Sequence, residues 1–147
     1  MHKRRICAKV KPFTPTLEHH VEENTAKDQN NWAGGVHVAA FVLALFSSWS
    51  AGVGGMIVAF VVWLMKKDES AYIRTHATEA FNFNFSMFLY TLIAVFLTVM
   101  TLGIGLIFVI PAALVLAIVW IWCTIKAAMA GFNGQEYRYP FTLRLLN

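Results

Sequence analysis

The chain has 147 residues, of which 58% are hydrophobic and only 14% are charged, and its formal net charge is +4. Soluble domains carry roughly 25% charged residues, so this composition excludes an ordinary soluble domain and indicates a membrane protein. The positive charge does not indicate nucleic-acid binding, because the basic residues flank apolar segments and form no basic patch interleaved with stacking aromatic residues.

Residues 1–30 are polar and of mixed charge, with Pro12, Pro15 and no apolar stripe of helical period. We predict that they form a disordered cytoplasmic tail, and the sequence leaves open whether all of it is translated. His19 and His20 are neighbours without further ligands nearby, so we expect no metal site in this segment.

The stretch from Trp32 to Met65 contains no Lys, Arg, Asp or Glu. As a single helix it would be about 50 Å long, too long for one crossing of a hydrocarbon core of about 30 Å. We therefore predict a hairpin of two short helices, over about 32–47 and 51–65. A re-entrant hairpin is the alternative, and the charges do not separate the two because both place them on the same side.

Residues 69–100 predict a third helix, with an apolar span from about Phe81 to Met100. An uncharged turn at 101–105 leads to a fourth helix over about 106–130, which contains Pro111. The expected fold class is all-α: a multi-pass transmembrane four-helix bundle over residues 31–147, preceded by the disordered tail.

This layout places all twelve Lys and Arg residues on one side of the membrane, and the loops on the other side carry no charge. Positive charge is retained on the cytoplasmic side of bilayers. We therefore predict a multi-pass membrane protein with both termini in the cytoplasm.

Polar residues recur at three- and four-residue steps along the third helix, so they share one helical face. They are His76, Glu79, Asn82, Ser86 and Tyr90. Polar side chains at membrane depth are costly unless they are paired or face a cavity, so this stripe should point into the bundle, toward His37. Interhelical hydrogen bonding that fixes the register is the favoured interpretation. A hydrophilic path is one alternative. A metal or proton site is another, although the other spans contain no acidic ligand.

Small side chains at four-residue spacing predict close packing between the first two helices. They are Gly35 and Ala39 on the first helix, and Ala51, Gly55 and Ala59 on the second. Hydrolase motifs, phosphate-binding glycine loops and the paired acids of intramembrane proteases are missing from the sequence. We expect neither enzymatic activity nor a cofactor.

Two further stretches, Lys66–Phe83 and Lys126–Pro140, carry a basic-acidic loop followed by His-Ala and a closing Gly-Gln-Glu-Tyr-Arg-Tyr-Pro. Their residues at the cytoplasmic face are Lys66, Lys67, Asp68, Arg74, Glu136, Tyr137, Arg138, Tyr139 and Pro140. Both stretches resemble the signature of a family of small bacterial four-helix membrane proteins of unknown function. That family is distantly related to the twenty-kilodalton channel subunit of the protein translocon at the chloroplast inner envelope (Tic-like). The resemblance covers about residues 30–146 and implies a four-helix bundle with both termini in the cytoplasm.

Together these features predict a non-enzymatic integral inner-membrane protein, a structural or accessory subunit of a membrane assembly. A translocation or channel component, resembling the translocon subunit, is the alternative, and a lipid-contacting scaffold is a weaker one. The expected partners are the lipid bilayer and either a second copy of the chain or another membrane protein.

Overall fold

The computed structural model describes residues 15–46 and 52–146, which form four α-helices and no strand. In chain order these are α1 (Pro15–Phe46), α2 (Val53–Lys66), α3 (Ala71–Met100) and α4 (Leu106–Phe132). A non-helical segment over residues 135–146, here called the C-terminal loop, follows α4. The predicted all-α architecture with four helices is therefore confirmed for the part of the chain that the structure describes.

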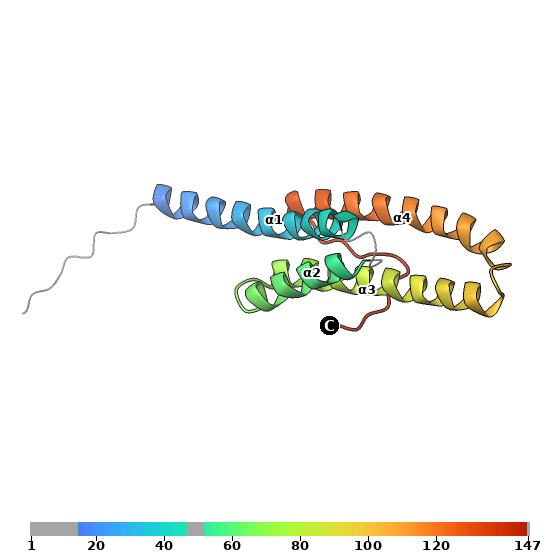
Figure 1. Ribbon diagram of the computed structural model, residues 1–147. Helices are drawn as coiled ribbons and strands as arrows, with labels where there is room; N and C mark the ends of the chain where they lie inside the picture. Colours follow the sequence, from blue (N-terminus) through green and yellow to red (C-terminus); the bar gives the residue numbers. More distant parts are fainter. Residues whose placement is uncertain (1–14, 47–51, 147) are drawn as a thin grey trace, which may run out of the picture.

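The helices form two hairpins of unequal length, with α2 packed on α3 and α1 packed on α4 (Figure 1). Gly52 precedes α2 and lies beside the middle of α3, where a Cβ added to it would be 3.1 Å from the carbonyl oxygen of Asn84. From there α3 continues to Met100, about 24 Å farther along its axis. The short α1–α2 hairpin therefore reaches only halfway along the long α3–α4 hairpin.

By length and composition, α3 and α4 can cross a membrane, and α2 is a shorter apolar helix. Residues 80–125 carry no charged side chain, and they include all of the α3–α4 hairpin that extends beyond the α1–α2 hairpin. The charged residues gather at the other end, around the turn between α2 and α3 and the end of α4, and on the N-terminal half of α1.

Beyond the short hairpin, α3 and α4 separate around an apolar cleft of about 1190 Å³. Its walls include Leu97 from α3, and Leu116 and Trp120 from α4. Pro140 and Phe141, at the tip of the C-terminal loop, line the same cleft. We call the part of the molecule beyond Asn84 and the tip of the short hairpin the far half, and the rest the near half. The far half is thus a pair of helices, whereas the near half is a bundle of four with the C-terminal loop among them.

The first helix corrects the predicted disordered tail, because it begins at Pro15 and not near Trp32. Pro15 is the first helical residue, where its missing N–H costs no hydrogen bond, and Glu18 in the first turn suits the positive end of the helix dipole. This part of α1 is exposed and projects from the bundle (Figure 1). The prediction failed because starting a helix is the costly step, and the packed residues of α1 have already taken it. The polar stretch only extends that helix. Residues 1–14 lie outside the described part of the chain.

Glycines set the distance between helices at two crossings. At the crossing of α1 and α4, a Cβ on Gly131 would be 2.6 Å from the backbone nitrogen of Gly34. The second crossing is where α2 meets α3 and α1. There a Cβ on Gly55 would be 2.5 Å from Oδ1 of Asn84 and 2.8 Å from the carbonyl oxygen of Ala40. Backbones approach this closely only where a side chain is missing, as is common between helices in membranes.

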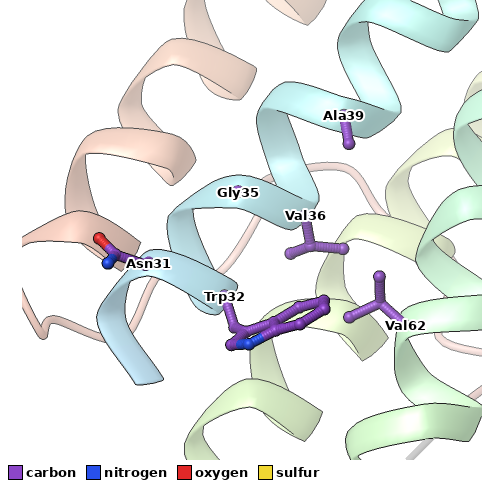
Figure 2. Close-up of a pocket in the computed structure, with 6 residues that line it drawn as sticks. All are labelled: Asn31, Trp32, Gly35, Val36, Ala39 and Val62. Atoms are coloured by element: carbon purple, nitrogen blue, oxygen red, sulfur yellow. The ribbon is translucent and has the colours of Figure 1, made fainter. Parts of the chain in front are cut away.

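The predicted packing residues of the first helix, Gly35 and Ala39, lie on the wrong face. A Cβ on Gly35 would meet nothing within 4 Å, and both residues line an open pocket of about 270 Å³. Figure 2 shows the ring of Trp32 extending below Val36 toward Val62 at this pocket.

The packed face of α1 carries Ala33, Val36 and Ala40, which are buried. Successive residues of a helix are separated by about 100°, so a shift of one position moves a side chain from the packed face to the open one. On the second helix, Gly55 and Ala59 are buried against their neighbours as expected for packing residues, and Ala51 lies outside the described residues.

Candidate functional site

The polar stripe of α3 faces the C-terminal loop. All five of its residues bond to this loop: His76, Glu79, Asn82, Ser86 and Tyr90. The loop runs along α3 from the level of His76 to the level of Tyr90, turns at Phe141 (φ 55°) and returns to Asn82. Figure 1 shows the loop starting at the end of α4, running toward the tip of the short hairpin and turning back toward its C-terminal end.

A chain of hydrogen bonds at the entrance of the loop joins α1, α3 and the loop itself. His37 Nε2 lies 2.9 Å from His76 Nδ1, and both residues are buried. His76 Nε2 lies 3.1 Å from the carbonyl oxygen of Gln135, and the hydroxyl of Tyr139 lies 3.0 Å from His37 Nδ1. Both ends of this chain of bonds therefore belong to the C-terminal loop.

The polarity of these bonds follows from their last acceptor. A carbonyl only accepts, so Nε2 of His76 carries a hydrogen and Nδ1 of the neutral ring accepts one. His37 must then donate from Nε2 and accept at Nδ1 from the hydroxyl of Tyr139. Every bond has one donor and one acceptor when both imidazoles are neutral.

Glu79 is buried and binds the loop through both carboxylate oxygens. Oε2 accepts the backbone N–H of Tyr139 at 3.1 Å, and Oε1 accepts Nη1 of Arg144 at 2.9 Å. Nε of the exposed Arg138 lies 3.8 Å from the same Oε1. The charge of Glu79 is thus paired by cations of the segment that it holds, as a buried carboxylate requires.

Deeper along α3, three residues satisfy the backbone of the loop. Oδ1 of Asn82 accepts the N–H groups of Leu145 and Leu146, and its Nδ2 donates to the carbonyl of Leu146. Oγ of Ser86 accepts the N–H of Leu143, and the hydroxyl of Tyr90 donates to the carbonyl of Phe141 at 2.7 Å. Non-helical backbone at membrane depth is tolerated only when its polar groups are satisfied in this way.

Tyr139 belongs to the interior and not to the cytoplasmic face where the sequence placed it. Its ring stacks on Phe83 with centroids 3.9 Å apart and is 4% exposed. Burial raises the pKa of Tyr139, and burial also raises the pKa of Tyr137 to about 12, with the neighbouring Cys123 as a second cause. Both phenols therefore keep their hydrogen at neutral pH, so Tyr139 can serve as the donor to His37.

The other residues of the predicted cytoplasmic face are spread over the charged end of the bundle. Lys66 pairs with Glu69 and lies over the ring of Trp32, and Lys67 lies over Trp63. Of the remaining ones, Asp68, Arg74 and Glu136 are exposed there. Pro140 was misplaced, because it lies deeper, at the apolar cleft between α3 and α4. Among residues 15–46 and 52–146, no group of three His, Cys, Asp or Glu side chains could hold a metal ion.

The sequence indicated the inward direction of the stripe and its link to His37, but it did not identify the C-terminal loop as the partner. The one signal for the loop was its composition. Residues 135–146 combine aromatic and apolar side chains with two arginines after the end of the last span, which suits a segment that packs on the bundle and supplies cations to it.

The model of one protein family, MamF/MmsF, described as the magnetosome magnetite crystal formation protein family, matches residues 28–146. The match agrees with the predicted membrane-protein family but gives no support for a relationship to the chloroplast translocon. No curated protein and no solved structure matches the chain at a significant level.

Proposed function

Since this chain belongs to the magnetosome magnetite crystal formation protein family, we propose that it is a non-enzymatic structural or accessory subunit of a membrane assembly. Its place would be a bacterial membrane of the kind that encloses a growing crystal. In this role the protein acts on the membrane and not on the mineral.

The observation that carries this proposal is the use made of the polar stripe. Each of its five side chains bonds to the C-terminal loop of the same chain. A path for a passing polypeptide or solute needs polar groups that are available to it. The pairing therefore favours a role in holding the near half of the protein together, over the alternative of a translocation component.

The distribution of charge supports a multi-pass topology with both chain ends in the cytoplasm. The Lys and Arg residues flank the near end of the bundle, and the turn at 101–105 is uncharged. In this topology α3 and α4 cross the bilayer. The α1–α2 hairpin, which ends beside Asn84, enters from the cytoplasmic side and returns to it without crossing.

Cysteine labelling tests this topology in intact cells that carry the protein in their cytoplasmic membrane and form no enclosed crystal compartment. Ile104→Cys, in the turn between α3 and α4, should react with an impermeant maleimide added outside the cell. Asp68→Cys, in the exposed turn between α2 and α3, should react only after the membrane is permeabilised. Labelling of Asp68→Cys in intact cells would refute the orientation.

Photo-crosslinking in cells tests the accessory role against translocation. A photoreactive residue replaces Thr91, which lines the cleft, and in a second variant it replaces Val61, an exposed residue of α2. We expect adducts with lipid, with a second copy or with one fixed partner from both positions. Adducts with many different polypeptides from Thr91, but not from Val61, would overturn the proposal in favour of translocation.

A further inference from the structure

With both imidazoles neutral, the bond chain between Tyr139, His37, His76 and Gln135 is complete and carries no charge. An imidazolium has two N–H donors and no acceptor. A proton on His76 would bring a second N–H against the one that His37 directs at it, across 2.9 Å. His37 could accept it only by moving its own hydrogen to Nδ1, and the hydroxyl of Tyr139 would then turn from donor to acceptor. The reversed chain of bonds would hold an unpaired positive charge on two buried rings, which is costly.

Two carboxylates, Glu79 and Glu136, act on His76 and would favour a proton there, and both are weakened by their surroundings. On α3, Glu79 has both oxygens bound to the loop, and Tyr72 is a neutral phenol. From α4, Cys123 faces Tyr137 and Tyr139, and on the loop Glu136 is exposed, so water and salt screen its charge. The one titratable residue of α2, Lys66, is held by Glu69 and Trp32 at the surface.

We propose that the His37–His76 pair is a protonation switch that releases the C-terminal loop from α3 when the pH falls. Both ends of the bond chain lie on this loop, at Gln135 and Tyr139. Departure of the loop removes the acceptor at one end and the donor at the other. It also opens the buried imidazoles to water, where each can carry its charge.

The direction and size of the effect follow from proton linkage. An imidazole in water takes up a proton near pH 6.5, whereas the closed loop accommodates the neutral pair. Closure is therefore fully favoured above about pH 6.5 and is lost as the pH falls below it. Each histidine that gains a proton on opening changes the closed-to-open ratio by up to about tenfold per pH unit. The two histidines together therefore change this ratio by at most about a hundredfold per pH unit.

Distance measurement between two spin labels tests the switch in nanodiscs. One label replaces the exposed Phe141 at the loop tip, and the other replaces Ile104 in the turn of the long hairpin, in a chain with Cys7→Ser and Cys123→Ala. We expect one narrow distance distribution at about pH 8. A second, broad population should grow as the pH falls below about 6.5. A single narrow distribution down to about pH 4.5 would overturn the proposal.

Variants assign the effect to the buried pair. His37→Gln with His76→Gln removes both proton acceptors, and this variant should keep one distance over the whole pH range. His19→Gln with His20→Gln changes the two exposed histidines of the same helix, and it should open as the wild type does. Equal opening in both double variants would refute the assignment.

A second measurement needs no substitution in the network. Nitrogen NMR of the protein with labelled histidine reports ring protonation directly, and His2→Gln, His19→Gln and His20→Gln leave His37 and His76 as the two rings observed. Two of the ring signals should change from neutral to charged in the same pH interval in which the distance distribution broadens. Loop opening while these rings stay neutral would contradict the switch.

Discussion

The near and far halves of this molecule solve the problem of a membrane interior in different ways. The near half packs four helices around directional polar bonds, with His37, His76 and Glu79 buried among them. The far half consists of α3 and α4 alone, separated by an apolar cleft and covered by exposed apolar side chains. In the near half, hydrogen bonds and backbone contacts fix how the helices lie against one another, whereas the far half leaves packing to its surroundings. Substitutions of similar size should therefore differ in effect according to the half in which they fall.

The largest effect is expected at the crossing of α1 and α4. Gly131→Ala would place a Cβ 2.6 Å from the backbone nitrogen of Gly34, and backbone cannot move aside as a side chain can. We expect a loss of about 3 kcal/mol in the free energy of unfolding, measured by SDS titration in mixed micelles. Gly35→Ala is the matched control. Because it meets open space, it should stabilise the protein by about 0.5–1 kcal/mol. Equal effects of the two changes would show that the close backbone contact at this crossing does not determine the stability of the protein.

Asn82→Ala should have the next largest effect, because it leaves two N–H groups and one carbonyl of the loop without partners. An unpaired buried polar group costs about 1–3 kcal/mol, so we expect a loss of about 2–3 kcal/mol in the same titration. Asn84→Ala is the control, since Nδ2 of Asn84 bonds within its own helix and Oδ1 has no partner. This change should cost no more than about 1 kcal/mol. If Asn84→Ala proves the more damaging, the loop does not depend on the stripe.

A smaller change is expected at the boundary between the halves. Tyr90→Phe keeps the ring and removes the hydroxyl that donates to the carbonyl of Phe141. One neutral hydrogen bond contributes about 1 kcal/mol, and its loss should show as greater mobility of a spin label at the loop tip. Thr98→Val removes a hydroxyl that bonds only within α3, and it should leave the mobility of that label unchanged. Unaltered mobility in Tyr90→Phe would place the end of the stripe at Ser86.

In the far half, Ile107→Ala should change the free energy of unfolding by less than about 0.5 kcal/mol. Ile107 is 71% exposed on α4, and lipid tails are as apolar as the side chain that is removed. The same titration measures it. A cost as large as that of Asn82→Ala would mean that this surface packs against protein, which the comparison of the two halves excludes for the single chain.

The parts of the fold that could be predicted are those that repeat along the sequence. The three- and four-residue spacing of the stripe gave its direction, and the apolar runs gave the long hairpin. The extended loop has no period, so its path along α3 had no local signal. Gly35 was misplaced because a shift of one residue turns a helix face by about 100°. The depth of the α1–α2 hairpin could not be predicted, because a full crossing and a half crossing put Lys66 on the same side.

The dependence of α3 on residues 135–146 has a consequence for biosynthesis. A ribosome delivers α3 to the membrane before it has made α4, and it makes the C-terminal loop after both. During that interval Glu79, Asn82 and Ser86 are inside or at the edge of the bilayer without the groups that later bond to them. The near half therefore reaches its final arrangement last, when the loop threads back along a helix that was inserted earlier.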